Sequence, residues 1–150
     1  VYENGRKVWY LNGKLHREDG PAIEDADGSK YWLINDKLLK YEVAVYENGS
    51  KVWYLNGKHH REDGPAIEGA DGSKYWFIND NLHREDGPAV EHVNGSKEWW
   101  INGKLHRVGG PAVEYADGSK EWWLDNKQYT EAQFNSMKKE ALGFPIKMVK

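Results

Sequence analysis

A tryptophan recurs at nearly constant spacing along this 150-residue chain. The spacing is 21 to 23 residues, and the tryptophans are Trp9, Trp32, Trp53, Trp76, Trp99 and Trp122. Their surroundings recur too, most completely as WYLNGKLHREDGPAIE and WYLNGKHHREDGPAIE, which begin at Trp9 and Trp53. A fixed period in this range is typical of proteins whose equivalent segments stack on their neighbours, so it predicts a repeat architecture. The chain starts partway through a repeat, and we expect that the natural protein extends further toward the N-terminus or was trimmed there.

Each repeat carries glycine turns at two places. Asp-Gly or Asn-Gly pairs lie between short runs of alternating polarity, at 27–28, 48–49, 71–72, 94–95 and 117–118. Such pairs favour two-residue hairpin loops, because both central residues need a positive φ. Asn-Gly at 12–13, 56–57 and 102–103 marks a second turn before the L-H-R-E-D-G connector. We therefore expect one hairpin and one structured loop per repeat, with a degenerate copy over 35–49 that has lost His, Arg and Pro.

Side-chain alternation in the strands assigns residues to two faces. The tryptophans share one face with aliphatic residues, and we expect this face to be the core: Leu11, Ile34, Leu55, Ile78, Ile101 and Leu124. The opposite face carries a second row of large side chains, which we call the aromatic row: Tyr10, Tyr54, Phe77, Trp100 and Trp123. Two interpretations of the aromatic row stay open, an exposed binding surface and a second core.

The last part of the chain changes character after Tyr129. Thr130 and Gln133 form a capping box that predicts a helix start, with Tyr129 placed to pack on Phe134. Phe134, Met137, Ala141 and Leu142 form a helical stripe, which Gly143 and Pro145 end. Such a helix would cover the last exposed strand edge. The predicted fold is an all-β repeat, an elongated twisted antiparallel sheet of about six stacked β-hairpin repeats (1–128), followed by a capping helix and basic tail (129–150).

The segments ADGSKYW, NGK and YENG resemble MORN-type repeats, especially the divergent arrays of bacteria, phages and large viruses. The resemblance covers about residues 1–128. This sequence lacks the glycine inside the aromatic strand and the G-x-G of the standard motif, and has L-H-R-E-D-G-P-A in their place. The resemblance implies stacked hairpins and a role in binding or scaffolding, without chemistry of its own.

The H-R-E-D-G-P segment holds most of the residues that could carry chemistry. Its basic side chains are candidate edge contacts or a structural ladder: His16, Arg17, His60, Arg61, His83, Arg84, His106 and Arg107. Equivalent histidines of neighbouring repeats would lie roughly 10 Å apart, too far to share a metal ion. The chain has no cysteine, no nucleophile elbow and no phosphate-binding glycine loop. We expect that the protein is not an enzyme and binds no metal or cofactor. We expect the motif to recur because it forms the contact between repeats.

Charge and composition limit the classes of partner that the protein could bind. The net charge is −3, so no overall positive charge attracts nucleic acid, although residues 127–150 alone carry five lysines against two glutamates. No apolar run approaches the roughly 20 residues that span a bilayer, and the lack of cysteine fits a cytoplasmic location.

We expect a protein–protein interaction module that uses the aromatic row, in one version a phage-encoded inhibitor of a host defence or nucleic-acid-processing protein. The alternative is a surface for glycan, anionic lipid headgroups or single-stranded nucleic acid, and open sheet ends would permit a homodimer.

Overall fold

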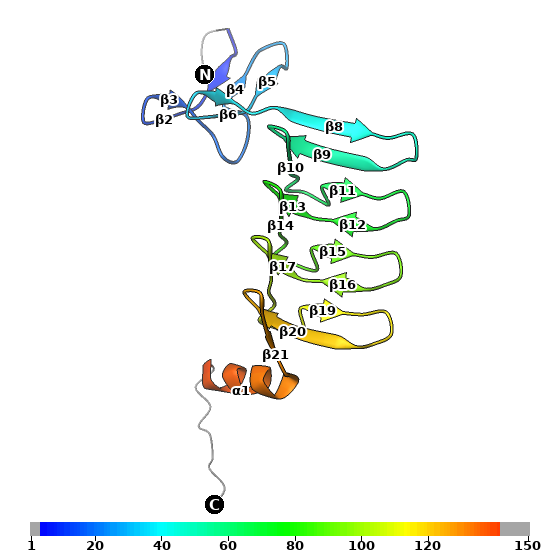
Figure 1. Cartoon of the computed structure of the whole chain (residues 1–150). Coiled ribbons are helices and arrows are strands. Elements are labelled where there is room, and N and C mark those ends of the chain that lie inside the picture. Colours follow the sequence, from blue (N-terminus) through cyan, green and yellow to red (C-terminus); the bar gives the residue numbers. More distant parts are fainter. Residues whose placement is uncertain (1–3, 142–150) are drawn as a thin grey trace, which may run out of the picture. The chain divides into compact units, whose positions relative to one another are not determined.

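The structure, a computed structural model, describes residues 4–141, with side chains to residue 138. It is mostly β, with many antiparallel hairpins and one C-terminal helix, which confirms the predicted all-β repeat class (Figure 1). The elements fall into two compact units. The first comprises Val1–Glu42 and Tyr54–Lys58, and the second comprises Val43–Trp53 and His59–Lys150.

The first compact unit contains a three-stranded sheet of order β1-β4-β5 and two further hairpins, β2–β3 and β6–β7. Its strands are β1 (Lys7–Val8), β2 (Tyr10–Leu11), β3 (Lys14–Leu15), β4 (Ile23–Glu24), β5 (Lys30–Tyr31), β6 (Leu33–Ile34) and β7 (Lys37–Leu38). A central sheet with short hairpins beside it is the pattern that the second unit repeats on a larger scale.

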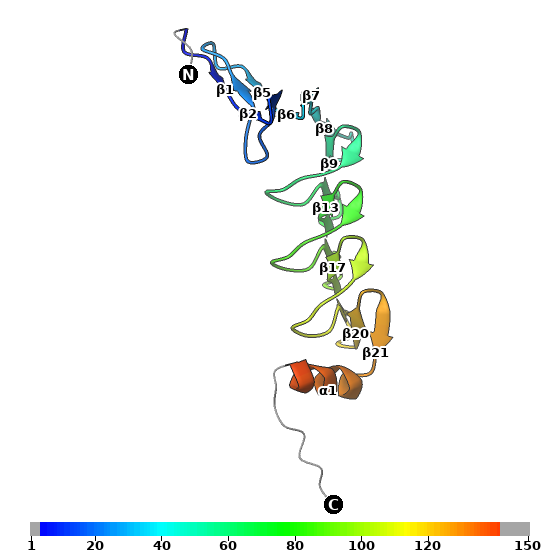
Figure 2. The same ribbon diagram turned by 90° about the vertical axis from the view of Figure 1, so that its left-hand side faces the viewer.

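The second compact unit contains most of a ten-stranded sheet of order β10-β9-β11-β12-β15-β16-β19-β20-β21, with β8 paired to β9; the boundary between the units passes through β8, β9 and β10. The next strands along the chain are β8 (Tyr41–Val45), β9 (Lys51–Leu55), β10 (Lys58–His59), β11 (Ile67–Glu68), β12 (Lys74–Tyr75), β13 (Phe77–Ile78) and β14 (Asn81–Leu82). They are followed by β15 (Val90–Glu91), β16 (Lys97–Glu98), β17 (Trp100–Ile101), β18 (Lys104–Leu105), β19 (Val113–Glu114), β20 (Lys120–Leu124) and β21 (Lys127–Tyr129). Equivalent hairpins follow one another in register (Figures 1 and 2).

Most repeats contain two hairpins rather than the one that we expected, because the strand changes partner at its tryptophan. Before Trp76, β12 pairs with β11 and with β15 of the next repeat. After Trp76, β13 pairs with β14 instead. Trp76 itself donates its backbone N–H to Ala89 of the next repeat at 2.8 Å, so the point of exchange also joins two repeats.

Opposite charges align across the sheet of the second unit. Lys74 lies opposite Glu68 of its own repeat and Glu91 of the next. The same alternation continues through the row Lys51, Glu68, Lys74, Glu91, Lys97, Glu114 and Lys120. Cross-strand pairs of opposite charge favour one register, because a shift by one residue would move every side chain to the other face.

The turns between the paired strands are one residue longer than the sequence predicts. The Asp-Gly turns were expected to be two-residue loops, but Gly69 N–H donates to Ser73 O at 2.8 Å and Gly72 N–H to Gly69 O at 3.0 Å. The loop therefore has three residues, and only its glycine has a positive φ, 93° at Gly72. This is a type I turn followed by a left-handed residue. The prediction of two-residue loops was wrong at these sites.

The second turns are the true two-residue loops. Asn56 and Gly57 have φ values of 51° and 77°, and the same left-handed pair is formed without glycine by Asp125 and Asn126, at 49° and 62°. The second residue of this turn also reaches the preceding repeat. Asn126 donates its N–H to Leu105 O at 3.1 Å, and its side-chain oxygen accepts the N–H of Leu105 at 2.7 Å. The turn thereby bonds both the N–H and the C=O of Leu105 in the preceding repeat, and we call this contact the clamp.

Replacing Asn126 by alanine is expected to lower the free energy of unfolding by about 1–2 kcal/mol. The change removes the acceptor for Leu105 N–H and leaves a Cβ-bearing residue without a local hydrogen bond in the left-handed region. Asn126→Asp keeps both properties, as Asp36 does at the equivalent position, where its carboxylate accepts Leu15 N–H at 2.8 Å. Denaturant unfolding of the two variants checks this; equal losses for alanine and aspartate would contradict the clamp.

The most buried side chains are small. Ala22, Ala66, Ala89 and Ala112 are fully buried, whereas all six tryptophans of the repeat are only partly buried. The expected core face is therefore only partly right. Leu55 is buried, but Leu11 is 49% exposed. Leu33 and Val52 are also buried, although alternation places them opposite the neighbouring tryptophans. Each of these alanines accepts the backbone N–H of the tryptophan before it, at 2.8 to 2.9 Å.

The C-terminal helix α1 (Glu131–Ala141) begins as the sequence predicts. Thr130 N–H donates to Gln133 Oε1 at 2.9 Å, and Gln133 N–H donates to Thr130 Oγ1 at 3.2 Å, which completes the capping box. Phe134 is buried, and α1 contacts β20 and β21, the last strands of the sheet (Figure 1). Leu142, Gly143 and Pro145, which were expected to complete and end the helix, lie outside the described residues.

Candidate binding surfaces

The arginine of the H-R-E-D-G-P loop lies over the indole of its own repeat. Arg84 has its guanidinium carbon 4.0 Å from the Trp76 ring centroid. Its Nε donates to Asp86 at 2.9 Å, and its Nη1 donates to Pro88 O at 3.0 Å and to Glu91 at 3.1 Å. The same stacking recurs as Arg17 on Trp9 at 4.2 Å, Arg61 on Trp53 at 4.0 Å and Arg107 on Trp99 at 3.8 Å. We call this arrangement the arginine staple.

The loop also joins its repeat to the next. Arg84 donates its backbone N–H to Trp100 O at 3.1 Å, and Nδ1 of His83 accepts the N–H of Asn102 at 3.0 Å. His16, His60 and His106 hold equivalent positions, with Nδ1 3.2 to 3.3 Å from the backbone nitrogens of Asn35, Asn79 and Asp125. Among residues 4–141 no group of three or more histidines and carboxylates could hold a metal ion. The structure thus places the candidate histidines and arginines at contacts within and between repeats.

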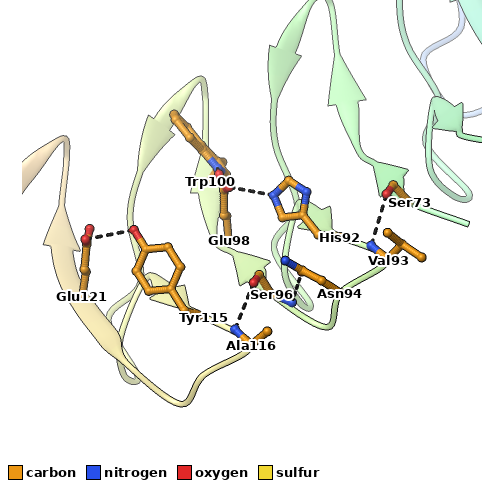
Figure 3. Close-up of polar contacts among 10 residues, drawn as sticks. All are labelled: Ser73, His92, Val93, Asn94, Ser96, Glu98, Trp100, Tyr115, Ala116 and Glu121. Carbon is orange, nitrogen blue, oxygen red and sulfur yellow. Dashed lines mark hydrogen bonds and ion pairs between the residues drawn. The ribbon is translucent and has the colours of Figure 1, made fainter. Parts of the chain in front are cut away.

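Serines after the turn glycines form a second ladder, which was not predicted from the sequence. Such hydroxyls usually bond to the local backbone, but Ser73 Oγ accepts the N–H of Val93 at 3.2 Å and Ser96 Oγ that of Ala116 at 3.0 Å (Figure 3). In each bond the acceptor belongs to one repeat and the donor to the next. The recurrence of serine after the turn glycine in five of the six repeats was the available signal.

The turn aspartates are held in their charged form by this serine. The N–H of Ser73 donates to Asp71 Oδ1 at 2.9 Å and its hydroxyl to Oδ2 at 3.0 Å, and these bonds lower the pKa of Asp71. Bonds from Ser119 lower the pKa of Asp117 in the same way. In the loops, the guanidinium of Arg61 lowers the pKa of Asp63.

These lowered pKa values predict a loss of stability in acid. The carboxyls are harder to protonate in the folded chain than in the unfolded chain, so they stabilise folding above about pH 4 and cease to do so as the pH falls through their folded pKa. We expect the free energy of unfolding to fall between about pH 5 and pH 2, and to fall less in Asp71→Asn/Asp117→Asn. Asparagine suits the turn, because Asn94 accepts Ser96 N–H at 2.9 Å. Equal pH dependence in both proteins would contradict this origin.

The aromatic row has two different environments. Tyr10 is 57% exposed, whereas Tyr54, Phe77, Trp100 and Trp123 are partly buried. In the last two repeats the indole N–H is bound by the carboxylate two residues before it. Trp100 Nε1 donates to Glu98 and Trp123 Nε1 to Glu121, both at 2.8 Å.

A third side chain completes each of these two clusters (Figure 3). His92 Nε2 lies 2.9 Å from the second oxygen of Glu98, and Tyr115 donates its hydroxyl to Glu121 at 2.9 Å. We call the two clusters the pinned indoles: His92–Glu98–Trp100 and Tyr115–Glu121–Trp123. The acids and their partners were not predicted from the sequence, although Tyr-Trp-Phe at 75–77 is replaced by Glu-Trp-Trp at 98–100 and 121–123.

A third feature is a pair of grooves between consecutive H-R-E-D-G loops. One, of about 770 Å³, lies between the loops that begin at Arg61 and His83, with Trp76 and Ile78 in its lining. The other, of about 590 Å³, lies between the loops that begin at Arg84 and His106, with Trp99 and Ile101 in its lining. Glu62, Asp63, Glu85 and Asp86 border the first groove.

The sequence matches no protein-family model and shows no significant match to a curated protein. Within residues 4–141, no helix is both long and apolar enough to cross a membrane.

Proposed function

We propose that this chain is a non-enzymatic protein-binding module that contacts its partner through the pinned indoles. The observation that carries the proposal is the paired bonding of Trp100 to Glu98 and of Trp123 to Glu121. Earlier repeats stack by the same loop and turn contacts without these groups. The clusters are therefore additional to what the fold requires.

The physical properties of the clusters suit an interface. Tryptophan and tyrosine are enriched at interface hot spots, where they provide large contact areas with few rotatable bonds. A carboxylate that accepts the indole N–H fixes the ring before binding, which reduces the entropy lost when a partner docks. The resemblance to MORN-type arrays favours the same class of function.

Affinity capture from a lysate of the source cell tests the proposal. The wild type is compared with Trp100→Leu/Trp123→Leu, since leucine is the natural residue at the equivalent position 33. Tyr10→Leu serves as control, because it removes a ring from the aromatic row in another repeat. We expect a stoichiometric partner with the wild type and the control and its loss with the double variant, after circular dichroism has shown that all three fold. Retention by the double variant, or no stoichiometric partner at all, would contradict the proposal.

A further inference from the structure

The two grooves between the loops present carboxylates to solvent while their arginines are withdrawn. In the first groove the side chains of Glu62, Asp63, Glu85 and Asp86 are 72 to 86% exposed. The guanidinium of Arg84, by contrast, lies on an indole and bonds to Pro88 O and to Asp86 Oδ1 within its own loop, and its side chain is 22% exposed. A ligand that approaches from solvent therefore meets carboxylates first, with an apolar lining of Trp76 and Ile78 below them.

The two grooves differ in charge, which provides an internal comparison. The first is lined by four carboxylates and two arginines, a formal charge of −2 with His83 neutral. The second is lined by Glu85 and Asp86 on one side but by Val108 and Gly109 on the other, and its two arginines bring the formal charge to zero. Glu85 and Asp86 border both grooves.

The spacing of the grooves suits an extended chain. Each repeat adds two strands to the sheet of the second compact unit, and neighbouring strands lie about 4.8 Å apart, so equivalent loops recur about every 10 Å. Figure 2 shows the loops projecting from the same side of this unit, one after another. A polyproline II chain repeats every three residues, a rise of about 9 Å. Every third side chain of such a peptide would therefore meet a groove.

We propose that the two grooves bind an extended polypeptide with basic side chains at every third position, one side chain per groove. The carboxylates at the rim take the ammonium or guanidinium group, and the aliphatic stem lies against the indole and isoleucine of the lining. The proposal goes beyond the protein-binding function above, because it assigns a ligand chemistry to a surface that the pinned indoles do not form.

Isothermal titration calorimetry at low salt with a synthetic peptide of repeated Lys-Pro-Pro triplets tests the inference. We expect the wild type to bind this peptide and not its Glu-Pro-Pro counterpart, with affinity that falls as salt is raised. Glu85→Gln/Asp86→Asn, which keeps the shape of both side chains, should weaken binding about fivefold, since exposed ion pairs contribute modestly. The control Glu47→Gln/Glu131→Gln removes the same charge from exposed positions outside the grooves and should change affinity less than about twofold.

A gain of affinity provides the complementary test. Val108→Glu/Gly109→Asp restores the acidic pair of the other loops; a Cβ at Gly109 meets nothing within 4 Å, and its φ is not in the left-handed region. We expect this variant to bind the Lys-Pro-Pro peptide about threefold more tightly. No binding by the wild type, equal binding of the Glu-Pro-Pro peptide, or unchanged affinity in both groove variants would overturn the inference. Trp100→Leu/Trp123→Leu should still bind the peptide, which separates a failure here from a failure of the proposed function.

Discussion

Arg84→Lys is expected to lower the free energy of unfolding by about 3 kcal/mol, although it conserves the charge. Lysine has a single ammonium group and cannot form the bonds that Arg84 makes to Asp86, Pro88 O and Glu91 at once. It also lacks the planar group that lies on Trp76. The carbonyl of Pro88 and the partly buried Glu91 would each lose a charged donor, and loss of one partner from such a network costs more than an exposed ion pair contributes.

The matched control is Arg6→Lys. Arg6 has its Nε 3.1 Å from Asp25 and a side chain that is 43% exposed, and no ring stacking is found for it among the described residues. We expect this variant to lie within about 0.5 kcal/mol of the wild type. Guanidinium chloride unfolding compares the two variants. A loss below about 0.5 kcal/mol for Arg84→Lys would show that the arginine staple does not stabilise the repeat.

Gly87→Ala is expected to destabilise the protein by about 2 kcal/mol. A Cβ at position 87 would lie 2.9 Å from the guanidinium carbon of Arg84 and 3.2 Å from its Nε, so the guanidinium would have to shift from its position over the indole. The close approach of the guanidinium group thus favours glycine at this position of H-R-E-D-G-P. Gly64 faces Arg61 at 3.0 Å in the same way.

Gly109→Ala is the corresponding control. It changes a glycine of the same loop in the next repeat, where a Cβ meets nothing within 4 Å. We expect no loss of stability there, and a small gain would fit the reduced freedom of the unfolded chain. Thermal unfolding of the two alanine variants measures the difference. Equal effects at 87 and 109 would mean that steric contact with the arginine is not the reason for the conserved spacing within the repeat.

The repeat, its turns and its helix start could be predicted because each has a local cause. Asn-Gly and Asp-Gly permit left-handed backbone, and Thr130 with Gln133 is a capping pair that needs no distant partner. The length of each loop could not be predicted in this way. Asp71-Gly72 closes a three-residue loop and Asn56-Gly57 a two-residue loop, and the difference depends on which strand residues pair beyond the turn.

The contacts within the loops were harder to predict from the sequence. The segment H-R-E-D-G-P contains donors and acceptors, but the sequence does not show which of them pair. In the structure Arg84 bonds to Asp86, to the carbonyl of Pro88 and to Glu91. That choice depends on the position of the Trp76 ring. The pinned indoles are different, because strand residues two apart share a face and the Glu-x-Trp spacing was available to predict the pairing of Glu98 with Trp100.

The central claim is that the recurring arginine is an internal staple of the repeat, and side-chain NMR of the arginines tests it most directly. The chain has five arginines, of which Arg17, Arg61, Arg84 and Arg107 lie over indoles and Arg6 does not. We expect upfield ring-current shifts for those four and not for Arg6. We also expect slowed exchange of Nε–H at Arg17, Arg61 and Arg84, where aspartate accepts it at 2.9 Å. Similar, solvent-averaged chemical shifts and fast Nε–H exchange for all five arginines would contradict the claim.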